Sequence, residues 1–181
     1  MVEFVLFCVP VLVCVLVWSR GKERTLGSAL KHVGATWGTP SAYGWALLLL
    51  PPLLLLSWLS TTLLPAEALE APGVAIAQLA SVGSVIAVVL RAAGEEALFR
   101  GLLGGVLIRR LGFLWGNLAQ ALLFLAPHLL LLLVDTRLWP VLPVQFAVGW
   151  LLGWLRHRTG TFLPGAVVHA VVNIASGLIV L

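Results

Sequence analysis

Charge is scarce in this sequence. Only 10% of its 181 residues are Asp, Glu, Lys or Arg, and the acidic residues number seven. Soluble domains carry about 25% charged residues, so this composition excludes an ordinary soluble globular domain. Apolar residues take their place, because 61% of the chain is hydrophobic and the mean hydropathy is +1.08. The sequence therefore predicts an integral membrane protein.

Cysteine is also rare, which argues against a disulfide-stabilised protein and against a cysteine-ligated metal protein. Cys8 and Cys14 lie six positions apart in the first apolar stretch, on different faces of a helix. Their spacing provides neither a disulfide framework nor a set of metal ligands.

The formal net charge of +4 suggests an anionic partner, but no stretch combines basic and aromatic residues into a face for nucleic acid. We therefore expect no nucleic-acid partner.

Apolar stretches follow one another along most of the chain. A bilayer core about 30 Å thick needs roughly 20 apolar residues in a helix. The stretches predict an all-α, polytopic bundle of about six transmembrane helices in one membrane domain, residues 1–181. The first stretch is expected to be retained rather than cleaved as a signal peptide, because Glu3 stands where a cation is usual and no small-residue cleavage site follows. The stretches are 2–18, 43–64, 73–108, 113–134, 139–155 and 162–181.

The third stretch is too long for a simple crossing. As a continuous helix at 1.5 Å per residue it would be about 54 Å long. It must therefore tilt steeply, bend near Gly94 or project from the membrane.

Basic residues between the stretches predict the orientation. Loops after the first, third and fifth stretches hold eight Lys and Arg residues, whereas the opposite loops hold only Arg137. Cytoplasmic loops are enriched in Lys and Arg, so this bias predicts six spans with both termini outside. The eight residues are Arg20, Lys22, Arg24, Lys31, Arg109, Arg110, Arg156 and Arg158.

Charged residues within the third stretch need a physical reason, because one at the centre of a spanning helix costs about 3 kcal/mol on insertion scales. Glu96 and Arg100 lie at i and i+4 with the glutamate first, the better order for an ion pair. Glu95 points about 100° away from Glu96 and is left to face something else. Arg91, one turn before Glu95, is able to pair with it and weaken it as a base.

Polar residues on two later stretches lie at a similar depth. Measured along each helix from its basic end at 1.5 Å per residue, Glu95, His128 and Asn173 lie about 21, 24 and 22 Å deep. His169 is one turn from Asn173 and shares its face. Three helices thus bring carboxylates, imidazoles and a carboxamide to one level, a combination able to activate water and bind an oxyanion.

The same residues form three ordered motifs on separate stretches. The chain resembles the CPBP intramembrane endopeptidases, which include the type II CAAX prenyl proteases and the bacterial Abi-type proteins. The resemblance covers roughly residues 83–177, the expected catalytic core. The chain departs from the pattern in its short length, in Pro127 and in Arg91. The motifs are Glu95-Glu96-x-x-x-Arg100, Phe124-x-x-x-His128 and His169-x-x-x-Asn173.

The resemblance implies a glutamate-dependent hydrolase without a cofactor or metal. In that family pattern Glu95, helped by His128, would deprotonate the attacking water, and His169 with Asn173 would donate hydrogen bonds to the oxyanion. Hydrolysis at this depth needs water, so we expect a polar cavity between the third, fourth and sixth spans.

Glu96 and Arg100 would hold the site together. The implied substrate is a membrane-associated protein or peptide, with CAAX-like tails, C-terminal sorting segments and peptide precursors all open. The implied location is a prokaryotic plasma membrane, crossed several times, and no feature predicts an oligomeric state.

Other interpretations of the polar residues remain open. The two Glu–Arg pairs are compatible with structural ion pairs, and the polar layer with a membrane scaffold or a small transporter. His169 and Asn173 suit a packing clamp between helices. Glu95, His128 and His169 form a known type of zinc ligand set, although no H-E-x-x-H motif is present.

Overall fold

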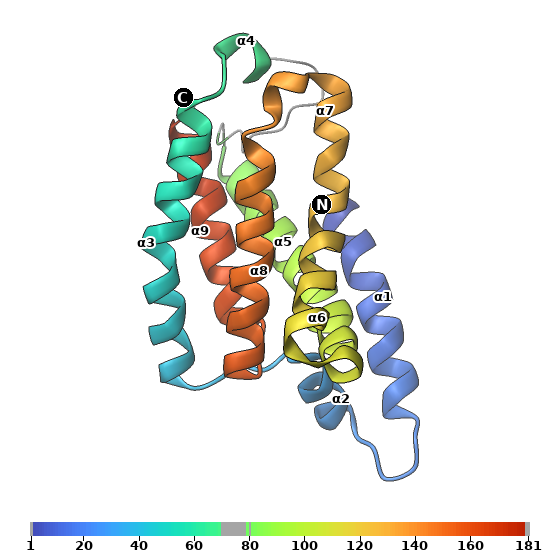
Figure 1. Ribbon diagram of the computed structural model, residues 1–181. Coiled ribbons are helices and arrows are strands. Elements are labelled where there is room, and N and C mark those ends of the chain that lie inside the picture. Colours follow the sequence, from blue (N-terminus) through green and yellow to red (C-terminus); the bar gives the residue numbers. More distant parts are fainter. Residues whose placement is uncertain (1, 70–78, 80, 180–181) are drawn as a thin grey trace.

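The computed structural model describes residues 2–69, 79 and 81–179, and these residues fold as helices without strands (Figure 1). The all-α prediction is therefore confirmed. The beginning of the predicted third stretch falls partly on residues outside this description. The helices are α1 (Val2–Ser19), α2 (Leu26–Val33), α3 (Pro40–Thr62), α4 (Ala66–Leu69), α5 (Val82–Glu95), η1 (Glu96–Gly104), α6 (Gly105–Leu125), η2 (Ala126–Leu130), α7 (Leu131–Val134), η3 (Thr136–Leu138), α8 (Val141–Thr159) and α9 (Leu163–Ile179).

Among the residues that the structure describes, four helical segments are long and apolar enough to cross a membrane. They are α1, α3, the continuous run Val82–Val134 and the run Thr136–Thr159, and α9 is a shorter apolar helix. Many large apolar side chains of these helices point outward, as in a bundle surrounded by lipid. The protein is thus an integral membrane helical bundle.

The run Val82–Val134 contains a reversal of the chain at Gly112 within α6. Gly112 has φ 75° and ψ 171°, a conformation that favours glycine. The two arms pack so tightly that a Cβ on Gly116 would lie 2.5 Å from Cα of Ile108. This hairpin separates the predicted third and fourth spans directly after the basic pair Arg109-Arg110, and the count of six crossings depends on it.

The first arm of this hairpin, α5 followed by η1, changes helical type rather than bending at Gly94. α5 begins with a capping box, in which Ser81 and Ser84 exchange hydrogen bonds between side chain and backbone. From Glu96 to Gly104 the helix is a π-helix. This form is rare in proteins as a whole, and where it occurs it is often at a functional site. α5 runs obliquely from beside α9 to beside α1. Tilt and a local change of winding therefore accommodate the long stretch.

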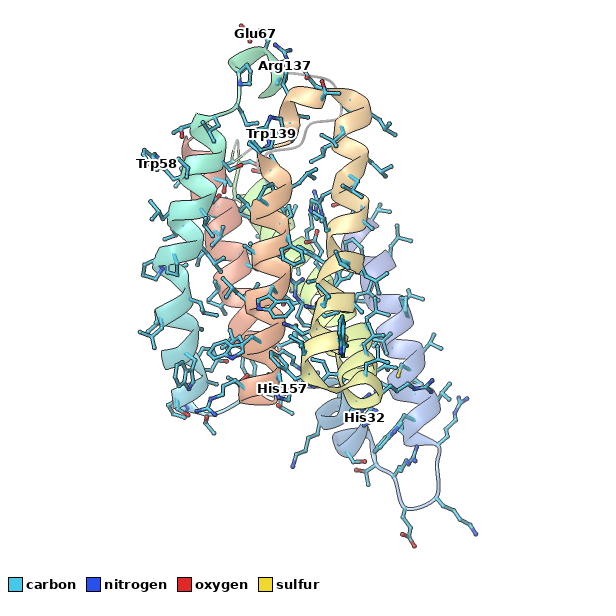
Figure 2. All side chains as sticks on the ribbon, viewed as in Figure 1. His32, Trp58, Glu67, Arg137, Trp139 and His157 are labelled. Carbon is cyan, nitrogen blue, oxygen red and sulfur yellow. The ribbon has the colours of Figure 1, made fainter. Side chains whose placement is uncertain are left out.

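The predicted polarity of the two ends is visible in the fold. His32 and His157 lie at one end, and Glu67, Arg137 and Trp139 lie at the other (Figure 2). At the first end, Arg109 Nη2 lies 3.0 Å from His32 Nε2, and the backbone amide of Phe162 donates to the carbonyl of Gly34. The loops rich in Lys and Arg therefore meet at a single end of the bundle.

Candidate active site

The π-helix η1 places one ion pair in the centre of the bundle. Arg100 Nη1 lies 3.0 Å from Glu96 Oε1, and both side chains are fully buried. Arg100 also donates through Nη2 to the carbonyl of Val148 on α8, and its guanidinium carbon lies 4.0 Å from the centre of the Phe124 ring. The pairing predicted from the i, i+4 spacing is present. Both charges are buried away from solvent, so removal of either partner would leave the other as an unpaired buried charge.

His169 on α9 lies between the two adjacent glutamates. Its Nδ1 is 2.9 Å from Glu96 Oε1, and its Nε2 is 3.6 Å from Glu95 Oε2. The first distance is that of a hydrogen bond, in which Nδ1–H donates to the carboxylate, whereas the second is too long for one. Glu96 therefore fixes the ring orientation, and Nε2 faces Glu95.

His128 stands on the short helix η2, which follows α6. Pro127 is accommodated because the chain tightens to a 3₁₀-helix there, with the proline in its first turn. His128 Nδ1 donates to the carbonyl of Phe124 at 2.9 Å, which leaves Nε2 as a hydrogen-bond acceptor. The Phe124 ring lies between the two histidines, with its centre 5.1 Å from that of His128 and 5.9 Å from that of His169.

A cavity of about 360 Å³ adjoins these residues. Glu95, His128, His169 and Asn173 all line it, whereas Glu96 and Arg100 lie behind its wall. A cavity is thus present between the third, fourth and sixth spans, as expected, and its lining combines polar with apolar side chains; α1, α3 and α8 also contribute to it. Its other polar lining residues are Glu3, Ser57, Ser60, Thr61, Arg91, Gln145 and Ser176.

Comparison with known proteins identifies the family. A family model described as "Type II CAAX prenyl endopeptidase Rce1-like" matches residues 77–175, more than half of the chain. The chain belongs to this family. Neither a curated protein nor a solved structure matches the chain. Membership of the Rce1-like family identifies a CAAX-type intramembrane protease, and the matched range includes every motif residue singled out from the sequence.

Sequence reasoning missed Glu3 as a part of this cavity. Arg91 Nε lies 2.9 Å from Glu95 Oε1 and 3.4 Å from Glu3 Oε2, so one guanidinium serves two carboxylates. The pairing of Arg91 with Glu95 follows from their spacing. The approach of Glu3 from α1 does not, although a lone acidic residue at the start of an apolar helix was a signal that it needs a partner.

Gln145 on α8 was also missed, as were Ser57 on α3 and Ser176 on α9, whose hydroxyl groups form a hydrogen bond across the two helices. Nothing in the local sequence of these helices distinguishes such residues from ordinary polar positions. Among the described residues, no three His, Cys, Asp or Glu side chains are arranged to hold a metal ion.

Proposed function

We propose that this Rce1-like protein is a glutamate-dependent intramembrane endopeptidase that uses Glu95 and His128 to activate water. The observation that carries the proposal is the shared cavity, which has Glu95, His128, His169 and Asn173 on its wall. A carboxylate, an imidazole with a free acceptor nitrogen and a carboxamide donor together are able to supply the base, the water orientation and the oxyanion donor for amide hydrolysis.

Water activation is assigned to Glu95 and His128. Glu95 accepts the proton of the attacking water and later returns it to the leaving amine, so the carboxylate is regenerated in each cycle. His128 orients the same water through Nε2, because its Nδ1–H is committed to the carbonyl of Phe124. Both side chains reach the cavity from different helices, and water between them is able to approach a carbonyl carbon.

Oxyanion stabilisation is assigned to His169 and Asn173. The two residues are one helical turn apart on α9, and both line the cavity. Because His169 donates through Nδ1 to Glu96, its Nε2 donates to an oxyanion only when the ring carries both protons. Asn173 supplies a second donor from its carboxamide. Glu96 and Arg100 have a supporting role, since their buried pair holds the His169 ring in position.

The substrate is proposed to be the C-terminal segment of a membrane-associated protein or peptide, either CAAX-like or a sorting signal. A volume of about 360 Å³ lies within the roughly 300–1,000 Å³ range of small-molecule sites and holds a few residues of an extended peptide. Leu131, Val141 and Val144 give the cavity an apolar side, which suits aliphatic substrate side chains.

The test uses the purified protein in detergent and three internally quenched peptides. One ends in a farnesylated cysteine and three further residues, one is the same peptide without the lipid, and one carries a C-terminal sorting segment. We expect cleavage of at least one peptide by the folded wild type, loss of cleavage in Glu95→Gln and no inhibition by a chelator.

Three results would contradict this assignment. Absence of cleavage of all three peptides argues for the scaffold or transporter interpretation. Cleavage that a chelator stops and zinc restores would identify a zinc protease instead. Retained cleavage in Glu95→Gln would remove Glu95 from the mechanism.

A further inference from the structure

One guanidinium beside the proposed base is shared between two helices. Arg91 of α5 contacts Glu95 at 2.9 Å on its own helix and Glu3 of α1 at 3.4 Å. The exposed fractions of the side chains rise from 6% for Glu95 through 40% for Arg91 to 55% for Glu3. The three residues line the cavity and form a chain of alternating charge that leads outward from Glu95.

The approach of α1 to this chain depends on Gly94. A Cβ on Gly94 would lie 3.3 Å from Cα of Phe4 and 3.2 Å from its ring, so a larger residue would push α1 away. Phe7, one turn further along α1, packs against Phe99 with ring centres 6.2 Å apart. These contacts fix the N-terminal turn of α1 beside Arg91. Glu3 lies outside the residues 77–175 that match the family, so the family match assigns it no role.

We propose that Arg91 and Glu3 are positioning residues that together set how strongly a neighbouring cation holds the Glu95 carboxylate. Because Glu3 lies on α1, this helix thereby contributes to the active site. The proposal rests on the assignment of Glu95 as the base. A cation next to a carboxylate favours the ionised form, but the more tightly it holds the carboxylate, the weaker that base becomes. Glu3 competes for the same guanidinium. Glu3 therefore limits how strongly Arg91 holds the Glu95 carboxylate.

Other charged or titratable groups also surround Glu95. His169 of α9 is 3.6 Å away, Glu96 and Arg100 of η1 are paired and sealed behind the wall, and His128 of η2 lines the same cavity. None of them contacts Arg91 or Glu3 among the ion pairs and hydrogen bonds of the described residues. Substitutions of Arg91 and Glu3 therefore leave the hydrogen bonds and ion pairs of these four residues with one another in place.

The first experiment compares pH profiles of kcat/KM on the farnesylated quenched peptide. In Arg91→Gln the acid limb should move to higher pH by about one unit, because Glu95 loses its nearest cation. In Glu3→Gln it should move the opposite way by roughly a few tenths of a unit, because Arg91 then serves Glu95 alone and the site is partly screened by solvent. The double variant should resemble Arg91→Gln. Glu67→Gln, an exposed carboxylate that does not line the cavity, is the control and should leave the profile unchanged.

A second measurement does not depend on turnover. The carboxyl infrared band that disappears in Glu95→Gln is titrated in the wild type and in each variant, and its midpoint should move in the directions given above. Because Glu3 is more than half exposed, Glu3→Gln should fold even if Arg91→Gln does not. An unmoved midpoint in Glu3→Gln, or shifts of both variants in the same direction, would overturn the proposal. Retained turnover in Glu95→Gln would instead refute the proposed function, and the infrared titration would still report on the ion pair.

Discussion

Two adjacent glutamates each meet an arginine four residues away, and yet their surroundings differ completely. Glu96 and Arg100 are fully buried, and their other hydrogen bonds are to His169 and to a backbone carbonyl. Glu95 lines the cavity, and its partner Arg91 is 40% exposed and shared with Glu3. The comparison shows that i, i+4 spacing predicts that a glutamate and an arginine pair, but not whether the pair is structural or catalytic. A sealed pair is a structural element, whereas a pair that opens to a cavity has a carboxylate available for chemistry.

The largest effect on folding should come from breaking the sealed pair. Glu96→Ala leaves Arg100 buried without a counter-ion, which should cost about 3–5 kcal/mol of stability. Folded yield and melting temperature in one detergent measure this cost, with Glu67→Ala as the matched control. The distinction between the two pairs would fail if Glu96→Ala folded as well as the wild type.

A somewhat smaller effect is expected at the oxyanion donors on the open side. Asn173→Ala should lower kcat by about 10²–10³ with little change in substrate affinity, because the lost hydrogen bond forms mainly in the transition state. Turnover, substrate affinity and melting temperature are measured together. Wild-type turnover with a lowered melting temperature would mean that Asn173 clamps helices instead.

The proposed oxyanion role of His169 is tested by His169→Gln, in which a carboxamide replaces the imidazole ring. The glutamine can still donate a hydrogen bond to Glu96 through its carboxamide nitrogen and therefore should fold, but it lacks the second ring nitrogen that faces Glu95. We expect a fall in kcat of about 10² and a modest loss of stability of about 1 kcal/mol. Equal turnover in His169→Gln and the wild type would show that the histidine serves packing only.

The smallest effect should come from the basic end of the bundle, far from both glutamates. Burial, together with neighbouring arginines such as Arg109, lowers the pKa of His32 below its usual 6.5. Between the lowered pKa and 6.5 the unfolded chain binds more protons, so stability falls as the pH drops through this window. His32→Gln should flatten this slope of the melting temperature between pH 7 and 5.5. An unchanged slope would mean that His32 does not contribute to it.

The sequence predicts well those features that depend on local spacing or on composition. Hydropathy located the apolar helices, the basic residues located one end of the bundle, and i, i+4 spacing paired Glu96 with Arg100. Equal depths also placed Glu95, His128 and Asn173 around one cavity, because rise per residue is nearly constant in helices.

Features that depend on contacts between distant helices were not predictable in this way. The π-helical winding of η1, the position of His169 between both glutamates and the contact of Glu3 with Arg91 arise from packing of α1, α5 and α9. Gly94 shows why, since its small size matters only once α1 is known to cross there. The orientation of a side chain such as His169 likewise depends on which partner its ring nitrogen finds.

The most direct measurement is turnover per folded molecule in Glu95→Gln, which keeps the shape of the side chain and removes its basicity. The variant should have the melting temperature of the wild type within a few degrees and lose about 10²–10⁴ in kcat on whichever peptide the wild type cleaves. Turnover at the wild-type rate in folded Glu95→Gln would contradict the account, because the glutamate that faces the cavity would then not be the base.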